Sequence, residues 1–338
     1  MPRPPRAKRN RPVHQPSAGE AYMRDGKKSG DFSHFSDLLD RRSFLIRSLS
    51  VSSLTLLGKA ALPGDLFAAA SATLSIGKGT NYANAVIDAV GGLGGIGTFI
   101  TGGERVVVKP NIGWDSPPQY GGNTHPVVVK TIIEMCLSAG AERVLVFDNT
   151  CADARRTYAN SGIKAAVEGL KNPKAKIEYI DDNKWVTRTL PKAKKLTEWT
   201  FYKEALTADK LINVPVAKNH GSTTLTLSMK NLMGIIGGNR GQIHWGIDQK
   251  LADISSFVKP TLIVLDATRI MLDGGPSGGD LGDVKVTNRV IAGTDPVAVD
   301  SYGATLFGMK GSDIGHIARA FEMGLGQIDL SKVRIIGA

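Results

Sequence analysis

Residues 104–140, ERVVVKPNIGWDSPPQYGGNTHPVVVKTIIEMCLSAG, predict a β-strand, a loop and an α-helix in that order. The first run of valines is continuous, which is typical of a strand buried on both faces of a sheet. The second apolar run begins after His125 with Pro126 and ends at Gly140, and Pro in the first turn with Gly at the end is typical of a helix. A buried strand followed by a helix is the repeating unit of a parallel sheet.

The same alternation of strands and helices continues along the chain. Further strands are predicted at 143–149, 175–181, 210–215, 260–267, 286–293 and 333–337, and helices at about 81–91, 161–170, 223–236, 248–257, 295–308 and 312–323. This order predicts an α/β fold with a mostly parallel or mixed β-sheet and helices on both of its faces. Ligands bind such sheets beyond the carboxyl ends of the strands, so we expect the active edge there.

The positive charge of the chain is concentrated at one end. The net charge is +11, but residues 1–72 contain 12 Lys and Arg against 6 acidic residues, which leaves 30 against 25 in the remainder. The sequence also has no basic stripe interleaved with aromatic residues and no zinc-finger spacing. Both observations argue against a nucleic-acid partner.

Residues 1–72 predict a disordered basic extension followed by a twin-arginine export signal. Arg41 and Arg42 precede a weakly apolar segment that ends in Ala70-Ser71-Ala72, so we expect cleavage after Ala72. The uncharged run at 48–58 is shorter than the roughly 20 residues of a membrane span. No stable membrane span is therefore expected after cleavage. The alternative is a surface helix preceded by a chance arginine pair.

This signal predicts the twin-arginine translocase as a partner and a periplasmic or extracellular location. The protein would stay attached to the membrane if the signal were not cleaved. Residues 73–338 are expected to form a single α/β domain, with a division into two lobes near residue 200 left open.

Five ordered motifs resemble the family called domain of unknown function 362. They are VVVKPNIG at 106–113, THPVVV at 124–129, INVPVAKNHGSTTLTLSMKNLMG at 212–234, the acidic and glycine-rich run at 273–278, and GTDPVAVDSYGATLFG at 293–308. The resemblance implies little about activity, because the family is largely uncharacterised. Some members carry an added ferredoxin-like cysteine module. This chain has only Cys136 and Cys151, so no iron–sulfur cluster is expected.

Polar residues collect where the predicted strands end. The residues expected to bind a ligand are Lys109, Asn111, Asp148, Asn219, Asn231 and Asp266, and those expected to be catalytic are Lys218, His220 and Lys230. Lysine attracts carboxylates and phosphates, and histidine is the usual acid–base group near neutrality. These residues together predict a cleft for a small anionic molecule.

Lys230 is the least expected of these residues, because it interrupts an apolar pattern. If a helix begins near Ser222 or Thr223, its free N–H groups would attract an anion together with Lys218. Lys230 would then lie on the same helical face as Thr226 and Gly234 and would line the cleft. The alternative is that this face is solvated and that Lys230 extends its ammonium group into water.

A metal site is a second expectation for the same edge. The candidate ligands are His125, His220, His244 and Asp300, and the last lies on an apolar helical face where a carboxylate needs a partner. Histidine with carboxylate suits zinc, nickel or iron, whereas carboxylates with Asn111 and water suit a hard divalent cation. A lone histidine at a helix start is also often only an N-terminal cap.

The order His220, Lys230, His244 is similar to an arrangement in nickel-pincer lactate racemase. That resemblance implies a lysine that anchors a preformed cofactor and histidines that bind the metal or move protons. The sequence does not identify the cofactor of this chain.

The leading interpretation is an exported enzyme that acts on a small anionic substrate, with a metal or preformed cofactor, in a cleft of Lys, His and Asp side chains. The alternative is a non-catalytic periplasmic binding protein for an anion or a metal. An enzyme needs an acid–base group with a displaced pKa within reach of the ligand, whereas a receptor needs only charge and hydrogen bonds.

Overall fold

A computed structural model describes residues 72–337. A ten-stranded mixed sheet organises this part of the chain, with the order β12-β1-β11-β10-β7-β2-β3-β4 and with β8 and β9 added beside β10. Most neighbouring strands are parallel, whereas β11 runs antiparallel to both β1 and β10. The expected α/β fold with a mostly parallel sheet is confirmed. The basic extension and export signal expected within residues 1–72 lie outside the described residues, except for Ala72.

The strands of this sheet are β1 (Thr73–Lys78), β2 (Arg105–Pro110), β3 (Arg143–Val146), β4 (Ala175–Ile177), β7 (Lys210–Val214), β8 (Val216–His220), β9 (Thr224–Thr226), β10 (Leu262–Met271), β11 (Val284–Gly293) and β12 (Arg334–Ile336). A separate hairpin pairs β5 (Trp185–Thr189) with β6 (Glu198–Tyr202). The helices are α2 (Tyr82–Gly91), α3 (Pro126–Ser138), α4 (Ala154–Asn160), α5 (Ile163–Glu168), α6 (Lys203–Thr207), α7 (Ser228–Asn231), α8 (Ile247–Phe257), α9 (Pro296–Thr305) and α10 (Gly315–Glu322).

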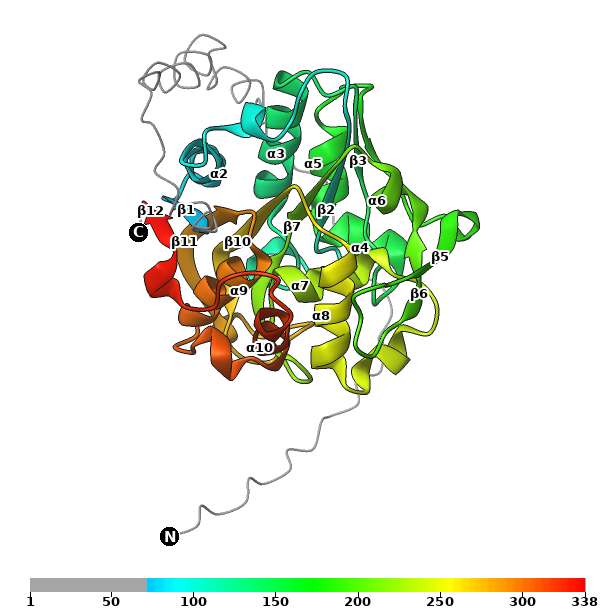
Figure 1. Cartoon of the computed structure of the whole chain (residues 1–338). Helices are drawn as coiled ribbons and strands as arrows, with labels where there is room; N and C mark the ends of the chain where they lie inside the picture. Colours follow the sequence, from blue (N-terminus) through cyan, green and yellow to red (C-terminus); the bar gives the residue numbers. More distant parts are fainter. Residues whose placement is uncertain (1–71, 338) are drawn as a thin grey trace, which may run out of the picture. The chain divides into compact units, whose positions relative to one another are not determined.

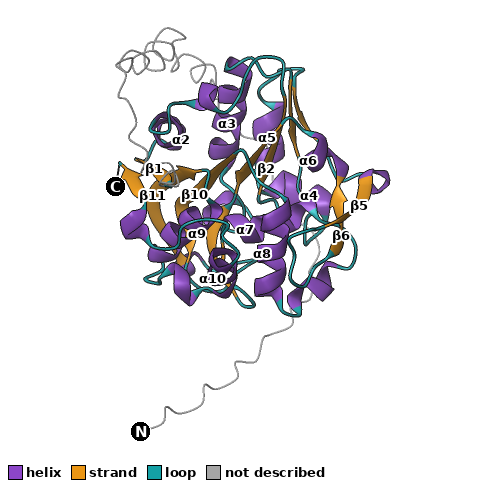
Figure 2. Ribbon diagram, viewed as in Figure 1, coloured by secondary structure: helices purple, strands orange, loops and turns teal. Residues whose placement is uncertain are grey.

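Helices cover both faces of the sheet (Figures 1 and 2). One layer contains α2, α3 and α5, which contact one another in succession, and the other contains α7, α8, α9 and α10. The valines of β2 are buried because helices lie above and below that strand. No helix within residues 72–337 has both the length and the apolar character needed to cross a membrane.

The strand and the helix expected within residues 104–140 are both present in the structure. β2 covers Arg105–Pro110 and α3 covers Pro126–Ser138, and Gly140 ends the helical region with a φ of 89°. His125 precedes α3, and its ring nitrogen Nδ1 accepts a hydrogen bond from the backbone N–H of Val127 at 3.3 Å. This histidine is therefore an N-terminal cap.

The helix expected at 223–236 is wrong in its first half. Thr224–Thr226 form β9, which pairs antiparallel with β8 so that Thr226 lies opposite Lys218. Helical structure is limited to α7 and a following 3-10 turn at Leu232–Ile235. Alternating threonine and leucine have the period of a strand, and β-branched threonine favours that conformation. Consequently the segment that follows Lys218 and His220 is a strand and not the start of a helix.

The helix expected at 161–170 is also different in the structure. Gly162 has a φ of 73°, and it separates α4 from α5. A residue in this left-handed conformation cannot continue a right-handed helix, so the expected helix is shortened to α5, and α4 precedes the expected range. No element expected from the sequence corresponds to β1, the β5–β6 hairpin, β8, α4 or α6.

Asp300 fixes the position of α7, which carries two residues of the expected site. Its carboxylate is fully buried and accepts hydrogen bonds from the backbone N–H groups of Ser228 at 2.7 Å and Met229 at 3.0 Å. The partner that the sequence argument sought for Asp300 is thus the first turn of a short helix. Burial is the main cause that raises the pKa of Asp300 to about 7.

Replacing Asp300 by Ala is expected to destabilise the protein by about 2–4 kcal/mol, because two buried N–H groups lose their acceptor. Urea unfolding at neutral pH measures this loss. Asp280→Ala is the matched control, since that exposed carboxylate accepts the Gly282 N–H at the surface. Equal stabilities of the two variants would contradict a role for Asp300 in holding α7.

Candidate functional site

A narrow cleft of about 60 Å³ lies where β2, β3 and β8 end. Its lining contains four basic side chains, one carboxylate, one imidazole and one thiol. They are Lys109, Lys218, Lys230, Arg240, Asp148, His220 and Cys151. Strand ends from both halves of the chain meet here because β2 lies between β3 and β7 in the sheet. The expected active edge therefore holds most of the expected polar residues.

Lys109 and Asp148 form a buried ion pair at the base of the cleft. The Lys109 Nζ lies 2.8 Å from Asp148 Oδ1, and it also donates to the Pro110 carbonyl and to Asn231 Oδ1. The ammonium group thus makes two hydrogen bonds in addition to the ion pair. Both charges are paired with each other, so neither is free for a ligand.

Gly234 lies against this ion pair. A Cβ at that position would be 1.6 Å from Asp148 Oδ1 and 2.5 Å from Lys109 Nζ, so there is no space for a side chain. The Gly234 carbonyl also accepts the Asn149 N–H at 2.9 Å. Glycine is thus required for the 3-10 turn after α7 to pack closely on the end of β3.

Asn231 and Asn111 connect the ion pair to Lys218, and Asn213 holds Asn231. Asn231 Oδ1 accepts from both Lys109 Nζ and Asn111 Nδ2, while Asn231 Nδ2 donates to Asn213 Oδ1 at 2.8 Å. Asn111 Oδ1 in turn accepts from Lys218 Nζ at 3.1 Å. Because each amide is held at both its oxygen and its nitrogen, its orientation is fixed.

Lys218 and Lys230 are buried in the cleft and form no ion pair within residues 72–337. Lys218 donates to Asn111 Oδ1 and to the Gly122 carbonyl, and Lys230 donates to the sulfur of Met233. Burial is the main cause that lowers the pKa of Lys218 to about 7 and that of Lys230 to about 8. A solvated position for Lys230 does not agree with its 8 % exposure.

His220 is neutral at physiological pH. Burial, and after it the charges of Lys230 and Lys218, lower its pKa to about 3. The ring Nδ1 accepts the Ser222 N–H at 3.1 Å, which assigns the ring proton to Nε2. His220 and Lys218 share a face of β8 because side chains two residues apart point the same way. Asn219, between them, is not among the residues that line the cleft.

Two residues of the cleft, Arg240 and Cys151, and the buried His316 outside its lining were not expected from the sequence. Arg240 lines the cleft and donates to the carbonyls of Asn149 and Thr150, and Cys151 contributes an exposed free thiol. His316 is fully buried, and burial together with the charge of Lys230 lowers its pKa to about 3. The position of Cys151 just after a predicted strand was a usable signal, whereas Arg240 and His316 stand in no motif.

The expected metal ligands are not brought together. The His125 ring packs edge-on against Tyr82 at 4.8 Å, His244 is exposed, and Asp300 holds α7. No group of three His, Cys, Asp or Glu side chains in the described part of the chain could hold a metal ion.

Asp266 is also directed away from the cleft. One carboxylate oxygen accepts the His125 N–H at 2.7 Å, and the other accepts the backbone N–H and hydroxyl of Thr268. This carboxylate joins the start of α3 to β10, so its contacts are structural.

Comparisons with known proteins support the resemblance seen in the motifs. Residues 106–305 match the family described as Domain of unknown function (DUF362). The thylakoid-associated protein sll1697 of Synechocystis sp. is 26 % identical over 242 residues, which cover 69 % of this chain and 72 % of the relative.

Two solved structures are similar at low sequence identity. One is a crystal structure of a Thermotoga maritima protein, with a TM-score of 0.46 and 10 % identity over 68 % of this chain and 60 % of the other. The second is the lactate racemase apoprotein from Thermoanaerobacterium thermosaccharolyticum, with a TM-score of 0.43 and 14 % identity over 69 % of this chain and 56 % of the other. The chain spans less than two thirds of either structure.

The pKa of Lys218 predicts how stability changes with pH. An unfolded lysine has a pKa of about 10.4. Between pH 7 and about 10 the unfolded state therefore binds a proton that folded Lys218 has lost, and this contribution to the free energy of unfolding rises with pH. The stability of Lys218→Met relative to the unsubstituted protein should accordingly be highest near pH 6.5 and decrease toward pH 9.5.

Urea unfolding at several pH values measures this difference. Lys174→Met is the control, because Lys174 is exposed and its substitution should shift stability equally at every pH. Parallel pH profiles for the unsubstituted protein and Lys218→Met would show that the pKa of Lys218 is not displaced.

Proposed function

The chain belongs to the DUF362 family, and we propose that it binds a small anionic molecule in its lysine-rich cleft and acts on that molecule as an enzyme. The observation that carries this proposal is the pair Lys218 and Lys230, two buried ammonium groups that face one cleft without an ion pair inside residues 72–337.

The charges of the cleft favour an anion. Lys109 and Asp148 cancel each other, which leaves Lys218, Lys230 and Arg240 without a carboxylate partner in this part of the structure. A bound carboxylate or phosphate would offset the cost of burying these cations and would raise the pKa of both lysines. Thr226 offers a further contact, because its buried hydroxyl lines the cleft and has no hydrogen-bond partner among the described residues.

Proton transfer at neutral pH distinguishes the proposed enzyme from a receptor. A lysine with a pKa of about 7 is partly neutral at that pH, so Lys218 can accept a proton as an amine and return it as an ammonium. Lys230 would remain mostly charged and hold the anionic group, and the Nε2–H of neutral His220 would donate to a substrate oxygen. A receptor that captures an anion by charge alone does not need these displaced pKa values.

The cleft residues do not suit a divalent metal ion. Asp148 is already paired with Lys109, and the remaining charged groups of the lining are cations, which would repel a metal. An anionic organic cofactor would meet the same favourable charges as an anionic substrate. The proposed reaction therefore relies on lysine and histidine side chains.

Lys230→Met tests the proposal, since methionine keeps the apolar stem contacts and removes the charge. Phosphate and succinate serve as probes in thermal-shift and calorimetric titrations. Binding of the anion that raises the melting temperature of the unsubstituted protein should weaken about tenfold or more in this variant, and likewise in Lys218→Met. The substituted proteins should still unfold cooperatively.

Lys174→Met provides the matched control and should bind the probe as the unsubstituted protein does. Equal affinities for both lysine variants and the control would remove Lys218 and Lys230 from the binding site. Binding that does not change between pH 6 and 9 would favour the receptor over the enzyme, because it would show no link to proton exchange.

Export through the twin-arginine pathway is the second part of the proposal. Arg41 and Arg42 precede a weakly apolar segment with small residues before Thr73, and this pathway carries proteins that have already folded. The Synechocystis relative is described as thylakoid-associated, so membrane attachment through an uncleaved signal is included.

Replacing Arg41 and Arg42 together by Lys should retain the precursor in the cytoplasm, because the translocase recognises the arginine pair. Cell fractionation and the mass of the exported form measure the effect. Replacing Arg3 and Arg6 by Lys is the control, and it should leave export unchanged. Normal export of the Arg41 and Arg42 variant would show that another route operates.

A further inference from the structure

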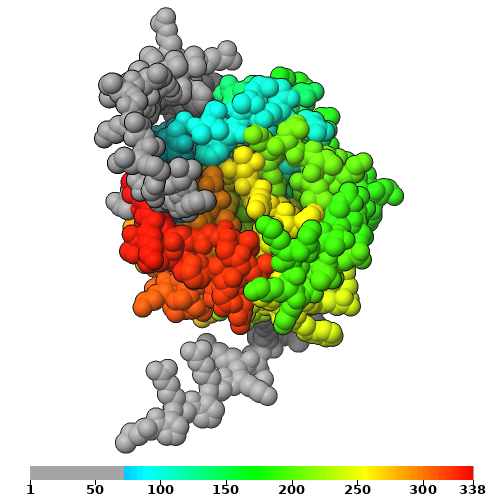
Figure 3. Space-filling model, in the orientation of Figure 1, coloured from blue at the N-terminus to red at the C-terminus, as the bar shows by residue number. Residues whose placement is uncertain are grey.

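A second and larger hollow lies on the other side of α7 from the cleft. Its volume is about 560 Å³, within the range of about 300–1,000 Å³ that holds small-molecule ligands. Ser228 and Met229 of α7 line this hollow, whereas Lys230 and Asn231 of the same helix line the cleft. In Figure 3 the surface is hollowed between the C-terminal residues, in red, and the segment near residue 100, in cyan. No motif of the sequence pointed to this hollow.

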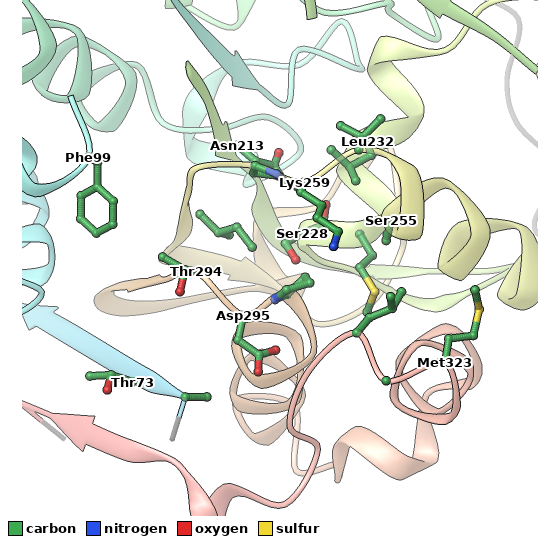
Figure 4. Close-up of a pocket in the computed structure, with 18 of the residues that line it drawn as sticks. Thr73, Phe99, Asn213, Ser228, Leu232, Ser255, Lys259, Thr294, Asp295 and Met323 are labelled. Atoms are coloured by element: carbon green, nitrogen blue, oxygen red, sulfur yellow. Dashed lines mark hydrogen bonds between the residues drawn. The ribbon is translucent and has the colours of Figure 1, made fainter. Parts of the chain in front are cut away.

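One part of the wall is apolar. Phe99, Leu232, Ile263 and Met323 come from four separate segments and line the same space. Figure 4 labels Phe99, Leu232 and Met323. Phe99 and Met323 are only half-buried, so their apolar surface is available to a ligand. Covering it would favour binding, because apolar surface would be removed from water.

Another part of the wall is polar and carries a small positive charge. Lys192 and Lys259 form no ion pair within residues 72–337, and Lys259 extends into the hollow together with Ser228 and Ser255 (Figure 4). The Ser228 hydroxyl is buried beside the Asp300 carboxylate, and this contact lowers the pKa of Asp300 against the larger effect of burial. The ammonium groups of the two lysines are therefore the polar groups that a ligand would meet.

Asp295 limits the charge that this hollow can accept. Its two carboxylate oxygens already accept the N–H groups of Ala298 at 2.9 Å and Gln327 at 2.8 Å. Two lysines and one aspartate leave a net charge of about +1 around the space. A ligand with a single negative charge matches this lining, whereas a dianion would leave one charge unmatched.

We propose that this hollow is a second binding site, distinct from the cleft, for an amphipathic monoanion: an apolar chain or ring that ends in a carboxylate. The carboxylate lies against Lys259, and Lys192 contributes a second positive charge to the same wall. The apolar body covers Phe99 and Met323. This site lies on the opposite side of α7 from the cleft, so it does not depend on the reaction proposed for the cleft.

Calorimetric titration of the full chain with decanoate, kept below its micelle concentration, tests the site. Decanoate should bind at one site per chain, and its neutral isostere decanamide should bind at least about tenfold more weakly because it lacks the charge. Lys259→Met should weaken decanoate binding about fivefold or more, and Lys192→Met should weaken it to a smaller extent. Thermal unfolding verifies that both variants are folded.

Two control variants give the experiment its specificity. Lys194→Met removes an exposed lysine from the same loop as Lys192, outside the lining, and should leave decanoate binding unchanged. Lys230→Met should also leave it unchanged, because Lys230 belongs to the cleft. The proposal is overturned if decanoate shows no saturable binding, if decanamide binds equally well, or if Lys230→Met abolishes binding while Lys259→Met does not.

Discussion

The buried ion pair between Lys109 and Asp148 is the interaction on which the cleft depends. It joins the ends of two neighbouring parallel strands, and Asn231 extends it to the helix that follows β9. Removing one partner of such a pair typically costs about 3–5 kcal/mol, because an uncompensated charge stays buried. Gly234 packs directly against the ion pair, and any side chain at this position would collide with Asp148 and Lys109. Because the two charges at the bottom of the cleft offset each other, the other lysines remain free for a ligand.

Helix α7 is the wall shared by both proposed sites. It has only four residues, and two of them line each space. A helix of this length has almost no intrinsic stability, so its position depends on the carboxylate of Asp300 and on the amide of Asn231. The two sites are therefore joined by a short structural element. A ligand that displaced α7 on one side would alter the lining on the other.

The electrostatic character of the cleft is local and is unrelated to the net charge of the chain. Most of the excess positive charge that belongs to residues 72–337 is spread over exposed lysines, which contribute little to binding. Lys218 and Lys230 differ because burial removes the water that would stabilise their charge. This desolvation penalty is present in the folded protein without a ligand, and a bound anion would offset part of it.

The sequence by itself determined the α/β fold and the edge at which polar residues gather. Strand and helix periods are local, and the carboxyl ends of parallel strands must meet, so Lys109, Asp148 and Lys218 could be placed together from their positions after apolar runs. Only the tertiary structure decided which neighbours belong to the cleft. His125 turns toward Tyr82, Asp266 is used by backbone N–H groups, and Arg240 arrives from a segment without a motif. Side-chain direction depends on strand pairing and on contacts distant in the chain: the pairing of β9 with β8 replaced an expected helix, and burial rather than residue type displaced the pKa values of the lysines.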